Sequence, residues 1–178
     1  MVFDCAPKEM LEVGKGSGVL EGYIKKQTGI EDQSLDLDQE LEPDLVGSVT
    51  EIPVEDETFD LVAAFEVLEH IPFADLERAL SELKRVTKRD VLISLPDLRP
   101  HLRLFGKIPF LPPFQIAFKL FFSRPHRFGG EHFWEVGERG YGNKKIINLL
   151  KKHFVLVKHF VPYGNQYHHF YWLKKDGR

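Results

Sequence analysis

Hydrophobic residues in the first hundred positions form two kinds of segment, short runs and longer stretches with a helical period. The stretches Val19–Lys26 and Ala74–Lys88 each place their apolar side chains on one helix face. The short runs have the length and content of strands, and they lie at Glu9–Val13, Ser34–Asp38, Leu45–Val49, Phe59–Val67 and Val91–Leu95. Strands that alternate with helices predict βαβ units and a mostly parallel sheet.

The pattern changes between Leu98 and Val136, which hold five prolines and eight of the 15 phenylalanines, interleaved with basic residues. We predict that residues 98–136 form a lid or substrate-binding insertion. A short helix is expected at Pro113–Phe122 and a mobile loop around Gly129 and Gly130. Two alternatives stay open for residues 98–128: contact with a membrane surface and a lipid-like substrate, or aromatic side chains that only complete the core.

The last third of the chain returns to regular elements. Asn143–His153 has a helical period, and Phe154–Val161 and Tyr167–Lys174 predict a closing hairpin of strands. The expected fold is therefore α/β: a doubly wound, mostly parallel sheet of about seven strands, an antiparallel C-terminal hairpin and helices on both faces. A length of 178 residues predicts a single domain.

Charge is unevenly distributed along the chain, although the net charge is only −3. Residues 1–97 carry 9 basic and 23 acidic residues, whereas residues 98–178 carry 15 and 4. Either this asymmetry marks an interaction surface or the two halves neutralise each other in the fold. We find no signal peptide and no membrane-spanning run, and Cys5 is the only cysteine, so we expect a cytoplasmic protein.

Three glycines, Gly14, Gly16 and Gly18, separate the first strand from the first helix. Such a turn exposes bare backbone and the N–H groups of a helix N-terminus, which together can bind a nucleotide. A dinucleotide fingerprint would place a third small residue at position 19, where the chain has Val19. The acid nearest the end of the second strand is Asp36, with Asp38 and Glu31 as competitors, and a carboxylate there can accept both ribose hydroxyls.

The glycine turn and the stretch Phe65-Glu-Val-Leu-Glu-His-Ile71 together resemble motifs of the class I (Rossmann-like) S-adenosylmethionine-dependent methyltransferases, type-11-like. The resemblance covers about Met10–Asp97 and implies S-adenosylmethionine as the cofactor. By this resemblance, Glu12, Gly14, Gly16 and Gly18 line its methionine part, Asp36 holds the ribose, Ser48 and Val49 border the adenine, and Phe65 and Glu66 lie near the reacting methyl. Only nine residues precede Met10, so the N-terminus is short compared with that of relatives.

The expected activity is methyl transfer to a small-molecule or lipid-like acceptor. His70 and His132 are the candidate general bases, because histidine titrates near neutral pH, although either can be structural. No metal site is predicted, since strand alternation sends His168 and His169 to opposite faces. A nucleic-acid substrate is not favoured. The alternatives are a non-catalytic cofactor-binding relative that acts through a partner and a nicotinamide-dependent oxidoreductase.

Overall fold

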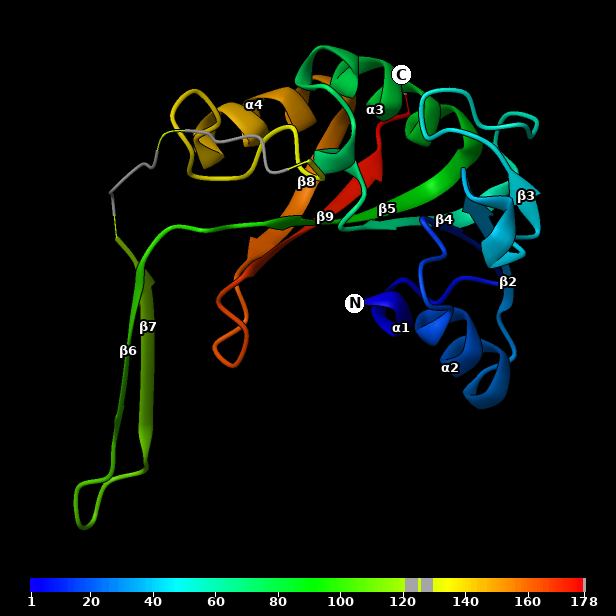
Figure 1. Cartoon of the computed structure of the whole chain (residues 1–178). Coiled ribbons are helices and arrows are strands. Elements are labelled where there is room, and N and C mark those ends of the chain that lie inside the picture. Colours follow the sequence, from blue (N-terminus) through cyan, green and yellow to red (C-terminus); the bar gives the residue numbers. More distant parts are fainter. Residues whose placement is uncertain (121–124, 126–129, 178) are drawn as a thin grey trace.

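The computed structural model describes residues 1–120, 125 and 130–177, and it is built around a seven-stranded sheet (Figure 1). The strand order is β3-β2-β1-β4-β5-β9-β8. These strands are β1 (Glu9–Val13), β2 (Glu31–Asp36), β3 (Leu45–Val46), β4 (Phe59–Phe65), β5 (Thr87–Pro96), β8 (Phe154–Phe160) and β9 (His168–Lys175). Neighbours from β3 to β5 pair in parallel, whereas β9 is antiparallel to both β5 and β8. The predicted fold, including the C-terminal hairpin, is confirmed.

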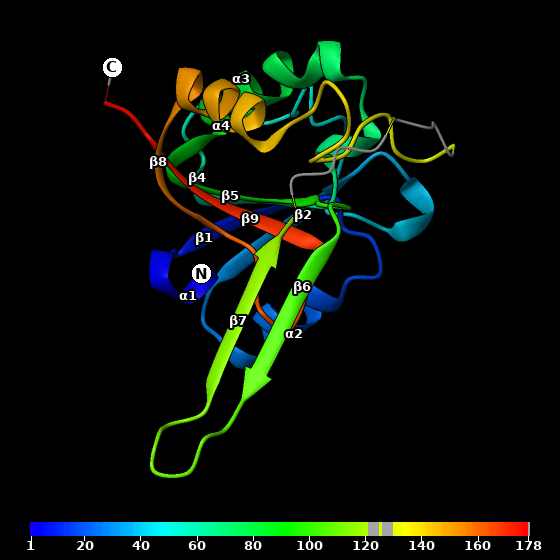
Figure 2. The ribbon, with the colours of Figure 1, turned by 90° about the vertical axis from the view of Figure 1, so that its left-hand side faces the viewer.

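Helices cover both faces of the sheet, as the two side views show (Figures 1 and 2). The short α1 (Val2–Cys5), which the sequence did not predict, and α2 (Val19–Gln27) lie on one face. On the other lie α3 (Leu76–Val86) and α4 (Asn143–His153). Single turns of 3-10 helix, Gln39–Leu41, Leu68–His70 and Phe73–Asp75, complete the helical elements of the described residues.

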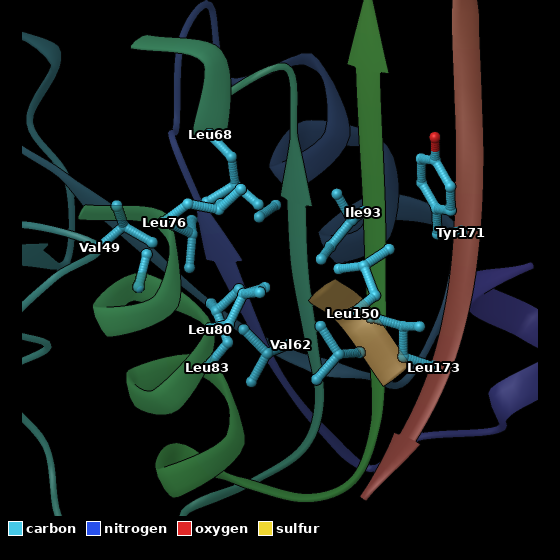
Figure 3. Close-up of a cluster of buried hydrophobic side chains, with 14 of the residues drawn as sticks. Val49, Val62, Leu68, Leu76, Leu80, Leu83, Ile93, Leu150, Tyr171 and Leu173 are labelled. Atoms are coloured by element: carbon cyan, nitrogen blue, oxygen red, sulfur yellow. The ribbon is translucent and has the colours of Figure 1, made fainter. Parts of the chain in front are cut away.

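The apolar core is divided into two layers by the alternation of side chains along the central strand. In β4, Val62 and Ala64 pack on the side of α3 and α4, whereas Leu61 and Ala63 pack on the side of α1. Figure 3 shows the larger layer, in which Leu80 and Leu83 of α3 meet side chains of the sheet. Because both faces of β4 are covered, its sequence is nearly continuous in apolar residues.

The predicted helix at Pro113–Phe122 is wrong. Phe114–Lys119 form a strand, β7, that pairs antiparallel with β6 (His101–Gly106). This two-stranded hairpin projects away from the rest of the molecule (Figures 1 and 2). The apolar residues of this segment alternate with a period of two: Leu102 is paired with Phe118, and Leu104 with Ile116. Residues 121 and 122 of the predicted helix, and Gly129 of the predicted loop, lie outside the described residues.

A buried ion cluster holds the base of the β6–β7 hairpin against the sheet. Asp97, which is 1% exposed, accepts hydrogen bonds from Arg99 Nε at 2.9 Å and Nη2 at 2.6 Å. The Lys119 ammonium lies 3.5 Å from the Asp97 carboxylate and donates to the Asp97 carbonyl oxygen at 2.7 Å. His169 Nδ1 lies 3.5 Å from the same carboxylate. Charges from β7, β9 and the end of β5 are therefore joined at one point.

Several strand limits differ from the prediction: β4 ends at Phe65, β5 begins at Thr87 and ends at Pro96, and the limits of β8 and β9 differ by one residue. The second strand begins at Glu31 and ends at Asp36, since Glu31–Leu35 pair in register with Glu9–Val13 of β1. The third strand ends at Val46, and Ser48 and Glu51 then form an isolated bridge that turns the chain. No helix among the described residues has the length and apolar character needed to cross a bilayer.

Candidate functional site

A crevice with a volume of about 320 Å³ opens at the carboxyl ends of β1, β2 and β4. This edge of a parallel α/β sheet is where such folds bind ligands. Its walls come from the glycine turn, the end of β2, the loop after β3 and the segment after β4. The lining residues are Val13, Gly14, Gly16, Leu35, Asp36, Leu37, Gly47, Val49, Phe65, Glu66, Val67, His70 and Ile71.

The glycine turn lines the floor of this crevice with backbone atoms alone. Its left-handed backbone conformation disfavours any residue that carries a side chain. Gly14, Gly16 and Gly18 have φ angles of 80°, 50° and 67°, in the left-handed region. A Cβ atom on Gly14 would lie 2.4 Å from Cγ2 of Val67, so this position has no room for a side chain. The Gly14 N–H donates to the Leu35 carbonyl oxygen at 2.8 Å, which ties the turn to β2. Gly18 is the N-cap of α2 and does not itself line the crevice.

Asp36 is the acid that the end of β2 presents to the crevice. Its Oδ2 lies 3.4 Å from the Gly16 N–H, and its Oδ1 accepts from the Asp38 N–H at 3.0 Å. The two competing acids are placed elsewhere: Asp38 caps a 3-10 turn by accepting from the Glu40 N–H at 2.9 Å, and Glu31 begins β2 at its opposite end. The carboxylate and the bare glycine turn therefore meet at one place.

Two other residues of the predicted cofactor site lie outside the crevice wall. Glu12 is 7% exposed, and burial, with the nearby charges of Asp32 and Glu21, raises its pKa to about 7. Ser48 contacts the Thr50 hydroxyl, with 2.8 Å between the two oxygens, in the turn after β3. Its neighbour Val49 is 5% exposed and lines the crevice.

Phe65 and Glu66 form the end of the crevice at the carboxyl end of β4. Glu66 has a φ of 55°, a strained value for a residue with a side chain. Its Oε1 accepts from the Ser94 hydroxyl at 2.6 Å, and its Oε2 lies 3.7 Å from His168 Nε2. Burial raises the pKa of the Glu66 carboxyl, and the hydrogen bond from Ser94 opposes this. Glu66 therefore lines the crevice while its carboxylate contacts Ser94 of β5 and His168 of β9.

His70 and His132, the two predicted bases, are brought together although 61 residues separate them in the chain. Their ring centroids lie 4.8 Å apart in an edge-to-face arrangement. His70 lines the crevice, whereas His132 is not among the residues of its wall. His70 Nδ1 is 3.0 Å from the Glu131 carbonyl oxygen, and His132 Nδ1 is 2.5 Å from Glu135 Oε1.

Glu69 joins these histidines and was missed by the sequence analysis. Its side chain is fully buried, and burial, with the negative charges of Glu66 and Glu135, raises its pKa to about 8. One ligating atom from each of Glu69, His70 and His132 lies within 4.8 Å of the others. The adjacent pair Glu69-His70, together with the later His132, could have indicated a metal site in the sequence. The sequence analysis weighed a metal site only at His168 and His169.

The comparisons with known proteins agree with this geometry. Residues 11–95 match a family model described as a methyltransferase domain. No curated protein sequence matches the chain.

Among solved structures, the chain is similar to a Pyrococcus horikoshii protein with a TM-score of 0.64 and 15% identity, over 94% of this chain and 83% of that one. It is similar to a glycopeptide N-methyltransferase in complex with S-adenosylhomocysteine, with a TM-score of 0.63 and 11% identity, over 98% of this chain and 86% of that one. A third similar structure is the Burkholderia thailandensis 1,6-didemethyltoxoflavin-N1-methyltransferase with bound 1,6-didemethyltoxoflavin and S-adenosylhomocysteine. Its TM-score is 0.57 and its identity 17%, over 95% of this chain and 71% of that one. At these identities the likeness establishes the fold. Residues 11–95 of this chain therefore match the methyltransferase-domain family model, and the chain has the Rossmann-like fold of S-adenosylmethionine-dependent methyltransferases of known structure.

Proposed function

We propose that the protein binds S-adenosylmethionine in the crevice and transfers its methyl group to a small-molecule or lipid-like acceptor. The observation that carries this proposal is the meeting of a glycine floor without side chains and the Asp36 carboxylate at the carboxyl edge of a parallel sheet. The two structural neighbours that bind S-adenosylhomocysteine support this choice of cofactor.

Each part of the crevice suits one part of that cofactor. The backbone of Gly14 and Gly16 would contact the methionine part, and Asp36 has two acceptor oxygens for the two ribose hydroxyls. Val49 supplies an apolar contact for the adenine ring. Phe65 and Glu66 then lie toward the reacting end. Glu12, Gly18 and Ser48 would act through the shape of the turns rather than by direct contact.

The chemistry depends mainly on placement. The cofactor supplies a methyl group on a positively charged sulfur. An acceptor lone pair forms the new bond to that carbon while the carbon–sulfur bond breaks and its electron pair stays on sulfur. Where the acceptor must lose a proton to the protein, His70 on the crevice wall is the candidate base, and the His132 ring lies 4.8 Å from it between centroids.

The β6–β7 hairpin supports a lipid-like acceptor. One face of the hairpin carries Leu102, Leu104, Ile116 and Phe118, which are each 45–49% exposed. At the tip, Phe110 is fully exposed. We propose that this hairpin contacts an anionic membrane surface, because it carries exposed apolar side chains together with the basic residues Arg103 and Lys107, and interfacial binding requires both.

Calorimetry with S-adenosylhomocysteine tests the cofactor assignment. Asp36→Ala should weaken binding by about 1–3 kcal/mol, roughly 5- to 150-fold, because hydrogen bonds to a charged group are lost. Glu31→Ala, an acid at the other end of the same strand, is the matched control and should bind as the parent does.

Equal affinity in the Asp36→Ala variant would show that the ribose contact is misassigned. The second measurement is methyl transfer from radiolabelled cofactor into lipid and small-molecule extracts. Tight binding with no labelled product in any extract would favour the alternative, a non-catalytic cofactor-binding protein that acts through a partner.

A further inference from the structure

The cluster of Glu69, His70 and His132 has the composition of a metal site. Two imidazoles and one carboxylate each offer a ligating atom, and these three atoms lie within 4.8 Å of one another. Three protein ligands of this type, with further positions left open, are common at catalytic zinc and other transition-metal sites.

The Glu69 carboxylate provides the independent observation that a ligand belongs here. Its side chain is 0% exposed, and neither oxygen accepts a hydrogen bond from any other residue that the structure describes. An isolated buried carboxylate is costly, and buried charges are normally paired or coordinate a metal. Two further carboxylates, those of Glu66 and Glu135, add negative charge around it. A cation would compensate all three.

Both histidines have the hydrogen bonds that orient metal ligands. The Glu131 carbonyl oxygen and the Glu135 carboxylate can only accept, so each Nδ1 must carry the proton when it contacts them. In the neutral imidazole this leaves a lone pair on each Nε2. Metal-ligating histidines typically donate their other N–H to a carbonyl or carboxylate in this way.

The backbone keeps His132 beside the Leu68–His70 turn. The Phe133 N–H donates to the Glu69 carbonyl oxygen at 2.8 Å. Trp134 is fully buried, and its Nε1–H donates to the Ile71 carbonyl oxygen at 3.1 Å. These two hydrogen bonds join the segment that carries His132 to the segment that carries Glu69 and His70. The fold itself therefore keeps the three side chains close to one another.

We propose that Glu69, His70 and His132 bind a divalent transition-metal ion, of which zinc is the simplest case, and that this ion takes the oxygen of a hydroxyl acceptor. Nitrogen and oxygen ligands on a tetrahedral zinc ion lie about 3.3 Å apart. The side chains must therefore close by about 1–1.5 Å on binding. His70 is exposed, so the ion can enter from solvent.

This proposal deepens the proposed function and rests on it. His70 belongs both to the cluster and to the crevice wall, so the ion would lie at the reacting end. A bound divalent ion lowers the pKa of a coordinated hydroxyl. The hydroxyl proton passes to water, the oxygen lone pair forms the bond to the methyl carbon, and the carbon–sulfur electron pair leaves with S-adenosylhomocysteine. The two imidazoles then act as ligands rather than as general bases.

Metal binding is measured on the purified, tag-free chain by equilibrium dialysis against zinc, followed by elemental analysis. The parent should retain about one ion per chain. His132→Ala and Glu69→Gln should each lose at least ten-fold in zinc affinity, and Glu69→Gln keeps the shape of the buried side chain. His101→Ala, an exposed histidine on the hairpin, is the matched control and should bind as the parent does. Cobalt should give a visible d–d absorption band that His132→Ala abolishes.

The metal site is overturned if the parent retains no zinc. It is also overturned if both His132→Ala and Glu69→Gln still retain zinc. Calorimetry with S-adenosylhomocysteine on the same samples separates the two proposals. Normal cofactor affinity without zinc binding refutes the metal site alone, whereas specific zinc binding without cofactor affinity refutes the proposed function and the acceptor role built on it. Thermal unfolding of each variant verifies that it is folded.

Discussion

Replacing Gly14 by alanine tests whether the crevice floor depends on a missing side chain. The φ of 80° at this position disfavours alanine by about 1–2 kcal/mol. The new Cβ would also lie 2.4 Å from Val67 Cγ2, well inside the 3.5–4.0 Å separation that carbon atoms prefer. Overpacking of this kind costs about 1–3 kcal/mol. Gly14→Ala should therefore destabilise the protein by about 2–5 kcal/mol, or roughly 4–20 °C in Tm.

Two other glycines separate the contributions. Gly16 has a φ of 50° but nothing within 4 Å of an added Cβ, so Gly16→Ala should cost only the conformational part, about 1–2 kcal/mol. Gly22 lies inside α2 with open space beside it, so Gly22→Ala should stabilise by about 0.5–1 kcal/mol. The difference between the variants at 14 and 16 then measures the clash with Val67.

Urea denaturation and calorimetry with S-adenosylhomocysteine are the assays. Because Val67 also lines the crevice, its displacement in Gly14→Ala should lower cofactor affinity as well as stability. Removing Cγ2 by Val67→Ala should restore part of the stability in the Gly14→Ala background, with a coupling energy of about 1–3 kcal/mol. If Gly14→Ala is as stable as Gly16→Ala, or if Val67→Ala restores nothing, the steric explanation of the bare floor is refuted.

Three further predictions concern the hairpin and its base. Asp97→Asn should lower the free energy of unfolding by about 2–4 kcal/mol at pH 7, because the half-buried Arg99 and Lys119 lose the buried counter-charge between them. Burial alone would raise the pKa of Asp97, but hydrogen bonds from Arg99 and His169 and the nearby charge of Lys119 hold that pKa well below its usual range. The ionised carboxylate thus contributes stability above the unfolded pKa of about 4. The difference in unfolding free energy between parent and variant should therefore shrink as the pH falls below about 4. A difference that grows would contradict this. Lys119→Met should make the hairpin more sensitive to limited proteolysis without changing cofactor affinity, and an unchanged cleavage rate would show that the hairpin is held otherwise. Phe110→Ser should reduce co-sedimentation with anionic lipid vesicles several-fold, and undiminished binding would refute contact through the tip.

The strands and helices of the sheet could be predicted because burial alone determines their sequence pattern. Phe59–Phe65 is covered on both faces and is therefore apolar almost throughout, and Asn143–His153 has one buried stripe. The hairpin could not be predicted in the same way. Its apolar residues alternate with a period of two, but they remain exposed in the described structure, so no buried face accompanies the alternation.

The crevice was predictable and the cluster behind it was not, for a physical reason. Topology brings the carboxyl ends of parallel strands to one edge, so the turn at Gly14 and the acid at Asp36 could be placed together from the order of elements. The contact between His70 and His132 depends on how residues 131–134 pack against the Leu68–His70 turn, which no local pattern contains. The same packing buries Glu69. In the sequence, Glu69 could therefore be recognised only as part of the Phe65–Ile71 motif.

The charge asymmetry between the two halves has two physical explanations in different parts of the fold. Cations of the second half pair with acids of the first across the sheet and its helices, as in Lys152–Glu77 at 2.7 Å and Lys175–Glu57 at 3.0 Å. There the halves neutralise each other. On the hairpin, Arg103 lies within β6 and Lys107 directly follows that strand, and neither forms an ion pair with any residue that the structure describes. Lys107 therefore adds positive charge close to the exposed Phe110, which is the combination that the proposed contact with an anionic bilayer requires.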